Sequence, residues 1–251
     1  MTANVTTLYR HPIKGYGVEE LAEITLVAGA AMPGDRVWAV RDANGQFNAD
    51  APEWVSCRNF ARGAKSPQLM AVKAQTHADE RLTLSHPDLP NITVDLTRAE
   101  DCARLLRWAK PLSGEGRAAS VEVVAAPGVS FTDSDWPSVS IMTQASLRAL
   151  SQAAGRSLSP LRFRGNIWLD GFAAWEEAEW EGRTLAIGEA RLEVVEPITR
   201  CRATTANPDT GQRDTDVLGI LNDRFGHQEF GMAARVVQSG RIAPGDGVRV
   251  L

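Results

Sequence analysis

About ten short apolar runs, separated by turn-forming residues, constrain the fold of this chain more than any other feature of its sequence. Runs of this kind predict β-strands. They lie at residues 5–9, 23–27, 37–40, 69–74, 81–85, 92–95, 121–125, 184–187, 191–195, 235–237 and 248–251. Asn44-Gly45 predicts a tight hairpin turn that returns through 46–48. Because the runs do not alternate with helical segments, they exclude a doubly wound parallel sheet.

Three other segments have the signals of α-helices. Thr97 and Glu100 have the spacing of a capping box, in which each side chain caps the backbone N–H group of the other. Thr143 precedes a helix that Gly155 closes, and Gly226 ends a third helix. The pattern predicts an α+β, β-rich protein: a β-barrel domain, a smaller N-terminal β-barrel-like domain and about three helices.

The chain is long enough for one large or two small domains, since it has 251 residues. Ser113-Gly-Glu-Gly116 is its most linker-like stretch. We therefore expect one β-rich domain over residues 1–115 and a second domain over 116–251.

Charge and cysteine content exclude several classes of protein. The net charge of −4 offers no overall attraction to nucleic acid or acidic membranes. The longest run without a charged residue, 136–147, is shorter than the roughly 20 residues of a spanning helix, and no secretory signal opens the chain. Cys57, Cys102 and Cys201 form no CxxC pair, so we expect neither a zinc cluster nor a disulfide framework. These features indicate a reduced, cytoplasmic protein.

Cys201 is the residue with the strongest indication of chemistry. The sequence contains no dinucleotide-binding, P-loop, zinc-protease or serine-hydrolase motif. Cys201, however, follows a predicted strand and lies between Arg200 and Arg202. Two neighbouring cations favour a thiolate, which is both a nucleophile and a soft metal ligand. The alternative interpretation is a small buried cysteine with both arginines pointing to solvent.

Three cations beside predicted turns suggest a second feature, a binding site for a phosphate. Lys14 is followed by Gly15, Arg36 begins a predicted strand, and Arg164 precedes another glycine. A lysine point charge and planar arginine forks are suited to a bound phosphate. The turn at 133–138 offers further backbone N–H donors. Taken singly, each of these cations is equally consistent with an ordinary surface residue.

Together these segments resemble the MOSC family, named for the C-terminal domain of molybdenum-cofactor sulfurase, and in particular its amidoxime-reducing members with an N-terminal β-barrel domain. The resemblance covers nearly the whole chain. The motifs that carry it are Tyr9-Arg-His-Pro-Ile-Lys-Gly15, Gly34-Asp-Arg-Val-Trp38, Phe163-Arg-Gly-Asn166, Arg200-Cys201, Thr204-Thr-Ala-Asn-Pro-Asp-Thr-Gly211, Phe230-Gly231 and Ile242-Ala-Pro-Gly-Asp246.

The resemblance implies a molybdenum cofactor, in which the metal is held by a molybdopterin dithiolene and a protein cysteine. By position, Cys201 is the implied metal ligand and catalytic residue. Lys14, Arg36 and Arg164 match residues that hold the pterin and its phosphate. Gly15 stands where the family often has serine, so only its backbone remains for the cofactor.

Other matching positions complete the implied site. Ser134, Asp135 and Trp136 match the loop beside the phosphate, and Thr199 and Arg200 match the residues just before the ligand. Arg200 and Arg202 would tune the sulfur. We expect the sulfur of Cys201 to face a concave chamber that is rimmed by cations and shared by both halves of the molecule.

The implied activity is reduction of small N-hydroxylated substrates at molybdenum. Because no cysteine-rich ferredoxin segment is present, electrons would come from a separate ferredoxin-, flavin- or cytochrome-type protein. Pyridoxal phosphate, nucleic acid and membranes are not expected as partners. One alternative is a sulfur or cofactor carrier in which Cys201 bears a persulfide or anchors the cofactor, and the purified protein could then retain no cofactor. A second alternative is a module that binds another phosphorylated ligand.

Overall fold

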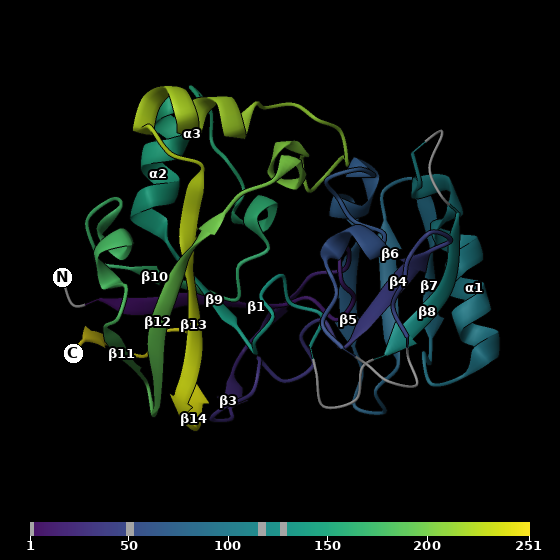
Figure 1. The fold of residues 1–251 in the computed structure, drawn as a ribbon, viewed down its shortest axis with the longest axis horizontal. Coiled ribbons are helices and arrows are strands. Elements are labelled where there is room, and N and C mark those ends of the chain that lie inside the picture. Colours follow the sequence, from purple (N-terminus) through teal and green to yellow (C-terminus); the bar gives the residue numbers. More distant parts are fainter. Residues whose placement is uncertain (1–2, 49–52, 115–118, 126–129) are drawn as a thin grey trace.

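The chain forms two lobes in the computed structural model, which describes residues 3–48, 53–114, 119–125 and 130–251 (Figure 1). The large lobe is built on an eight-stranded sheet of order β15-β11-β12-β13-β9-β10-β1-β2. Its strands are β1 (Asn4–Arg10), β2 (Glu19–Leu21), β9 (Val139–Thr143), β10 (Ile167–Asp170), β11 (Thr184–Ile187), β12 (Ala190–Thr199), β13 (Glu229–Gln238) and β15 (Val248–Val250). A separate pair joins β3 (Ile24–Leu26) to β14 (Gly240–Ile242).

The small lobe contains two further sheets and one helix. Strand β4 (Trp38–Asp42) pairs with β8 (Ser120–Ala125). A three-stranded sheet consists of β5 (Lys73–Thr76), β6 (Leu82–His86) and β7 (Leu89–Val94), and α1 (Ala99–Ala109) packs beside it. The α+β, β-rich class is therefore confirmed, although none of the four sheets of described residues closes into a complete barrel.

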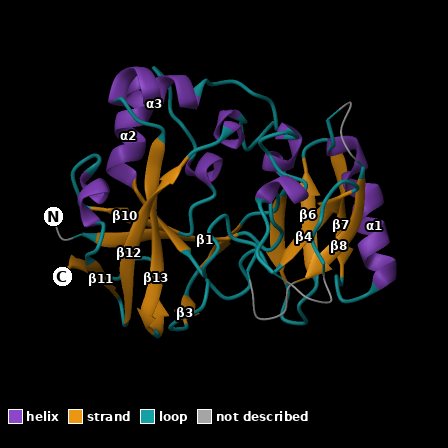
Figure 2. Ribbon diagram, in the orientation of Figure 1, coloured by secondary structure: helices purple, strands orange, loops and turns teal. Residues whose placement is uncertain are grey.

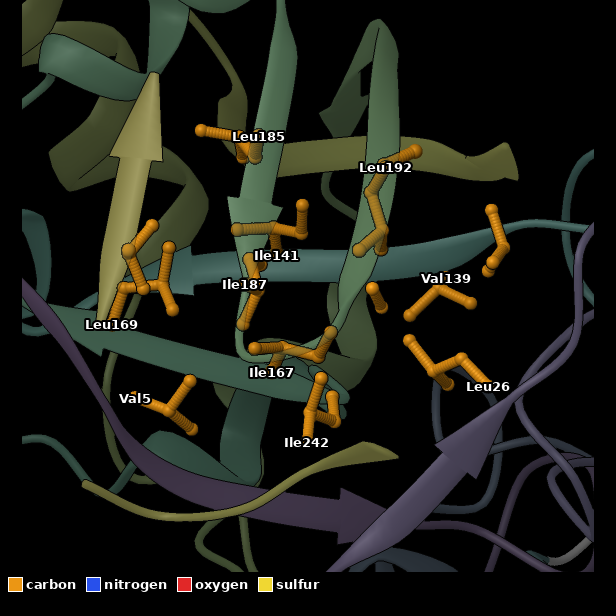
Figure 3. Close-up of a cluster of buried hydrophobic side chains, with 14 of the residues drawn as sticks. Val5, Leu26, Val139, Ile141, Ile167, Leu169, Leu185, Ile187, Leu192 and Ile242 are labelled. Atoms are coloured by element: carbon orange, nitrogen blue, oxygen red, sulfur yellow. The ribbon is translucent and has the colours of Figure 1, made fainter. Parts of the chain in front are cut away.

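The core of the large lobe lies on one face of its eight-stranded sheet. Figure 3 shows Ile141 of β9 and Ile167 of β10 within this core, and the two residues are partners in the parallel β9–β10 register. On the opposite face, Met142 and Trp168 pack with residues of α2 (Gln144–Ala153) and α3 (Val217–Phe225). Because both faces of β9 and β10 are covered, these strands lack the apolar–polar alternation that marks a half-buried strand, and the sequence did not predict them.

Helix caps were predictable because they are local. Thr143 caps α2 by accepting from the Ser146 N–H group at 3.3 Å, and α3 ends at Gly226 in the left-handed region. The predicted capping box of α1 is wrong. Its N-cap is Arg98, without a side-chain cap, because the Thr97 hydroxyl donates to Asp95 at 2.5 Å instead.

Two predicted strands are also wrong, and the lobes divide differently from the sequence halves. Residues 69–71 of the predicted strand 69–74 belong to a 3₁₀ helix (Pro67–Ala71), and only residues 73 and 74 lie in a strand, β5; residues 46–48 form no strand. The predicted domain boundary between 115 and 116 lies outside the described residues. Strand β1, near the N-terminus, lies inside the large sheet between β2 and β10, so the chain crosses between the lobes more than once.

Loops and short helical turns occupy the junction of the two lobes, as Figure 2 shows. The Lys14 N–H group donates to the Trp38 carbonyl at 2.7 Å, which ties the loop after β1 to β4. On the other side of the junction, Lys73 donates to the Pro208 carbonyl at 3.2 Å. Residues from opposite ends of the sequence thus meet where the predicted site residues lie.

Candidate functional site

A buried carboxylate, Asp35, organises the first part of the site. It is fully buried, and its Oδ1 accepts from the His11 backbone N–H at 2.7 Å and from Asn166 Nδ2 at 3.1 Å. Its Oδ2 pairs with the Arg36 guanidinium. Asn166 also donates to the Tyr9 carbonyl at 3.2 Å. We call Asp35, His11, Asn166 and Arg36 the carboxylate framework; it joins three of the sequence motifs.

The charges within this framework are fixed by burial. Burial of the His11 imidazole, with the nearby Arg164 charge, lowers its pKa to about 3, so the ring is neutral. Burial raises the pKa of Asp35, but Arg36 and the hydrogen bonds from His11 outweigh that effect and hold it well below its usual range. Neutral His11 therefore donates through Nδ1, 3.2 Å from the ionised Asp35 carboxylate.

Arg36 and Arg164 share a rare backbone conformation and lie against each other. Their φ angles are +51° and +49°, in the left-handed region. Arg36 donates through Nη2 to the Arg164 carbonyl at 3.0 Å. Arg164 in turn donates to the carbonyls of Ile13 at 3.2 Å and Gly17 at 3.4 Å. Non-glycine residues persist at such φ angles where surrounding contacts hold them, and such residues concentrate at functional sites.

Arg164 differs from Arg36 in its charge balance. Burial, followed by repulsion from Arg36, lowers the pKa of Arg164 to about 9. No described carboxylate forms an ion pair with Arg164, whereas Arg36 pairs with Asp35. An anion placed beside Arg164 would restore the balance, because opposite charge favours the protonated guanidinium.

Lys14 is almost fully buried and reaches a loop of the opposite half of the sequence. Its Nζ donates to the Phe131 carbonyl at 2.8 Å and to Asp133 at 2.6 Å. Desolvation raises the pKa of Asp133, but Lys14 with Arg36 and Arg164 lowers it more. The side chain of Asp133 is nevertheless 82% exposed, so the pair joins a buried lysine to a carboxylate that faces solvent.

Gly15 is required by the close approach of the small lobe. Its φ is +87°, and a Cβ added there would lie 2.3 Å from the Ala61 carbonyl oxygen. A side chain at this position would clash with backbone. The serine that the family often has at this position does not fit the conformation of this chain.

Cys201 lies two residues after the end of β12 and is exposed, so the interpretation of a small buried cysteine is wrong. Its neighbour Arg200 is buried beside the stacked rings of Phe163 and Phe230, at 5.7 and 5.9 Å from their centroids. Arg200 donates to the carbonyls of the same two residues, at 2.9 Å to Phe163 and through Nε at 2.7 Å to Phe230. Arg202, in contrast, is exposed.

Electrostatics connect Cys201 to the Lys14 side of the site. Burial lowers the pKa of Arg200 to about 9, while Cys201 and Asp133 raise it and Arg36 lowers it. Asp133 therefore lies within electrostatic reach of Arg200 as well as in contact with Lys14. Hydrogen bonds also link these segments: Arg200 donates to the carbonyl of Phe163, and Arg36 donates to the carbonyl of the next residue, Arg164.

The remaining predicted residues have other neighbours. Ser134 donates to Glu196 at 3.4 Å, and the Arg235 guanidinium lies 5.2 Å from the Trp136 ring centroid. Asp135 is exposed, and Thr199 is an exposed residue that ends β12. The side chains of Ser134 and Trp136 contact β12 and β13, and their carbonyls accept from the Thr132 hydroxyl at 3.0 and 3.3 Å. No described hydrogen bond joins either residue to Lys14, Arg36 or Arg164, so their part in the site stays a prediction.

Arg213 is a residue of the site that the sequence did not single out. Its Nη1 donates to the Arg202 carbonyl and to Thr205 Oγ1, both at 2.6 Å, and its Nη2 donates to the Ala64 carbonyl at 2.8 Å. It thereby joins the 3₁₀ turn after Cys201, residues 202–205, to the small lobe. Only its place just after the Thr204–Gly211 motif could have indicated it. Asp35, His11 and Asn166, by contrast, stand inside quoted motifs.

No group of three or more His, Cys, Asp or Glu side chains among the described residues is arranged to hold a metal ion. None of the described helices is long and apolar enough to cross a membrane.

Comparison with known proteins gives matches to two family models. Residues 2–125 match the MOSC N-terminal beta barrel domain, and residues 130–249 match the MOSC domain. The chain is 40% identical over 63 residues to the molybdenum cofactor sulfurase of Bos taurus, covering 25% of this chain and 7% of that protein. It is 38% identical over 80 residues to the mitochondrial amidoxime reducing component 2 of Homo sapiens, covering 32% and 23%.

Among solved structures, the chain is similar to the YUAD protein of Bacillus subtilis. The sequence identity is 13% and the TM-score is 0.48. The alignment covers 100% of this chain and 96% of that one.

Proposed function

Because the chain belongs to the MOSC family, we propose that it is a molybdenum-cofactor-dependent oxidoreductase that reduces N-hydroxylated substrates, with Cys201 as the metal ligand. The observation that carries the proposal is the exposed Cys201 thiol, whose buried neighbour Arg200 lies within electrostatic reach of Asp133. Asp133 in turn is paired with Lys14. Similarity to an amidoxime reducing component supports the choice of substrate class.

The donor groups present fit a molybdenum cofactor. A cysteine thiolate is a soft ligand, and Cys201 is accessible. Lys14, Arg36 and Arg164 are suited to the anionic phosphate of a pterin cofactor. Arg164 is the best candidate among them for a bound anion, because no described carboxylate pairs with it. When bound, the cofactor supplies two-electron redox chemistry, and the protein supplies binding, orientation and charge.

The protein's own residues are largely ordered for binding. Arg36 is oriented by Asp35 and by the Arg164 carbonyl, and Arg164 by the carbonyls of Ile13 and Gly17. Side chains that are already fixed lose little entropy when a ligand binds. The overall reaction consumes two electrons and two protons, breaks the N–O bond, forms an N–H bond and releases water. A separate ferredoxin-, flavin- or cytochrome-type protein supplies the electrons.

The test is reduction of an N-hydroxylated amidine by protein expressed in a host that makes the molybdenum cofactor. Cys201→Ser should lose the activity and bound molybdenum together, since a hydroxyl is a poor substitute for a soft thiolate. Cys102→Ser is the matched control, because Cys102 lies on α1 in the small lobe and its thiol donates to the Leu96 carbonyl. Undiminished activity of Cys201→Ser would rule out the proposal.

A sulfur or cofactor carrier is the second candidate, and the exposure of Cys201 together with similarity to a molybdenum cofactor sulfurase favours it. A carrier presents its sulfur to another protein, which an exposed turn permits. Intact mass would then increase by one sulfur atom in a Cys201-dependent manner. Substrate reduction would be absent even from protein loaded with molybdenum.

A further inference from the structure

A patch of unpaired cations adjoins the turn that follows Cys201. We call it the basic patch: Arg58, Arg62 and Lys65 of the small lobe, with Arg202 and Arg213 of the large lobe. Elsewhere most described cations near the junction are paired, as Lys14 and Arg36 are. Within the described part of the chain, none of the five side chains of the basic patch forms an ion pair.

Contacts across the junction bring the two halves of the basic patch together. Arg213 donates to the Ala64 carbonyl at 2.8 Å and to the Arg202 carbonyl at 2.6 Å. A Cβ added at Gly63 would lie 3.5 Å from the Cβ of Ala203. The small-lobe segment 61–66 therefore packs directly against the turn that follows Cys201.

The small-lobe half of the patch is itself compact. The Lys65 N–H group donates to the Arg62 carbonyl at 3.1 Å, which makes a tight turn. Arg62 Nη1 lies 2.9 Å from the Cys57 sulfur, which ties this turn to the short helical segment that carries Arg58. On its other side, Arg62 Cα lies 2.9 Å from a Cβ added at Gly15, beside Lys14. The basic patch is thus continuous with the candidate site.

The sign of the local charge is opposite to that of the whole chain. Residues 57–66 contain three cations and no acidic residue, and residues 197–206 contain two cations and no acidic residue, whereas the chain has a net charge of −4. Unpaired surface charges act over a Debye length of roughly 8–10 Å. The patch therefore presents a positive potential at the rim of the Cys201 turn.

The form of the patch favours a macromolecular partner over a small anion. Arg58, Lys65 and Arg202 are exposed and come from both lobes. Arg213 uses its guanidinium for three protein acceptors, and Arg62 uses Nη1 for Cys57. The guanidinium N–H groups of Arg213 and Arg62 are therefore partly used within the protein. They are less able to bind one phosphate in a bidentate manner, but their positive charge still acts on a partner at the surface.

We propose that the basic patch is the docking surface for an electron-donor protein with an acidic face. The inference rests on the proposed function, which needs two electrons from a separate protein. Redox encounters bury little area and depend on complementary charge for their association rate. A donor docked here would lie beside Cys201 and supply the two electrons that, with two protons from water, convert the N–OH group to N–H and water.

The first test measures binding of a reduced, acidic [2Fe–2S] ferredoxin at low and high ionic strength. Arg58→Glu/Lys65→Glu removes exposed cations that take no part in the candidate site. Arg107→Glu/Lys110→Glu is the matched control, since it changes the net charge equally at exposed positions in and just after α1 (Figure 1). We expect the patch variant to bind about tenfold more weakly at low ionic strength, and wild-type binding to fall steeply with salt.

Equal binding by the patch and control variants would overturn the docking surface, as would binding of the wild type that is insensitive to salt. Neither result depends on molybdenum, because binding is measured without turnover. Failure of the proposed function is therefore distinguishable from failure of the docking surface.

The second test compares two electron donors during substrate reduction. Reduced benzyl viologen is small and needs no docking surface, so the patch variant should retain the wild-type viologen-driven rate. Its KM for ferredoxin should rise about tenfold while the control variant stays close to wild type. Equal loss with both donors would show that the patch acts on the site itself and would contradict the proposal. A wild type inactive with viologen would instead contradict the proposed function.

Discussion

The carboxylate framework and the Cys201 turn are two halves of one candidate site with opposite ways of handling charge. In the framework, Asp35 is fully buried and compensates Arg36 across a network of short contacts. At the turn, Cys201 and Arg202 are exposed, and the Arg213 guanidinium holds the turn by donating to the Arg202 carbonyl and the Thr205 hydroxyl. The first half is suited to fixing an anion, and the second to presenting a reactive sulfur.

This difference predicts how each half of the site responds to a change in sequence. A buried ion pair that loses one partner leaves an uncompensated charge in a poorly solvated environment. An exposed group is solvated by water when it loses a contact. The framework should therefore respond to mutation through stability, and the turn through reactivity and local order.

The largest effect is expected from Asp35→Asn. It removes the buried negative charge that pairs with Arg36, and we expect the free energy of unfolding to fall by about 3–5 kcal/mol. Denaturant unfolding measures it. Asp79→Asn is the control, because Asp79 and its partner Arg81 are both more than half exposed on the small lobe, and it should remain close to wild type. A small loss of unfolding free energy in Asp35→Asn would contradict the claim that the carboxylate framework responds to mutation through stability.

The next largest effect is expected from Arg200→Met. This variant tests whether the two arginines beside Cys201 differ in their contribution to stability. The carbonyls of Phe163 and Phe230 would lose their buried donor, at a cost of about 2–4 kcal/mol. Arg202→Met, on the other side of Cys201, removes an exposed cation and should change stability little. Thermal or denaturant unfolding measures the stability of both variants. Comparable losses of unfolding free energy would contradict the different burial of these arginines.

The pH dependence of stability should reveal the lowered pKa of His11. The folded pKa of about 3 lies below the unfolded value of about 6.5, so the unfolded chain takes up a proton first as the pH falls. Stability is thus complete above about pH 6.5 and decreases towards pH 3, by about 2 kcal/mol between pH 7.5 and pH 5. Unfolding at a series of pH values measures this. His11→Asn should lose that part of the slope, and an unchanged slope would contradict a neutral His11.

The smallest effect is expected from Arg213→Gln. Arg213 is half-buried, so the loss of its contacts with Ala64 and Arg202 should cost about 1 kcal/mol globally. Locally, amide hydrogen exchange in residues 202–213 should become faster. Arg249→Gln is the matched control, because Arg249 is an exposed arginine of β15 in the same lobe. Unchanged exchange in Arg213→Gln would show that other contacts hold the turn.

How much of this organisation was predictable depends on the range of the interactions. Thr143 and Gly226 were predictable as helix ends because they act on backbone groups within a few residues. The capping box predicted from Thr97 was wrong because the Thr97 hydroxyl donates to Asp95 instead. Strands β9 and β10 were missed because their pattern reflects coverage of both faces, which no local signal reveals.

The site shows the same division. The motifs indicated Lys14, Arg36, Arg164 and Cys201 as candidates, and they also contain Asp35, the ion-pair partner of Arg36. They did not indicate that Asp133 would be the partner of Lys14, or that Arg213 would join the Cys201 turn to the small lobe. Both contacts join segments more than ten residues apart.

The sequence by itself determined the β-rich class, the start of α2 and the end of α3, and a lone cysteine set between two arginines within a family's ordered motifs. Only the tertiary structure decided that Arg200 is buried and Arg202 exposed, that Asp35 forms an ion pair with Arg36 and none with Arg164, and that the basic patch forms across the junction. The reason is physical: capping and strand formation act over a few residues, whereas burial and charge pairing depend on groups that meet only when the chain has folded.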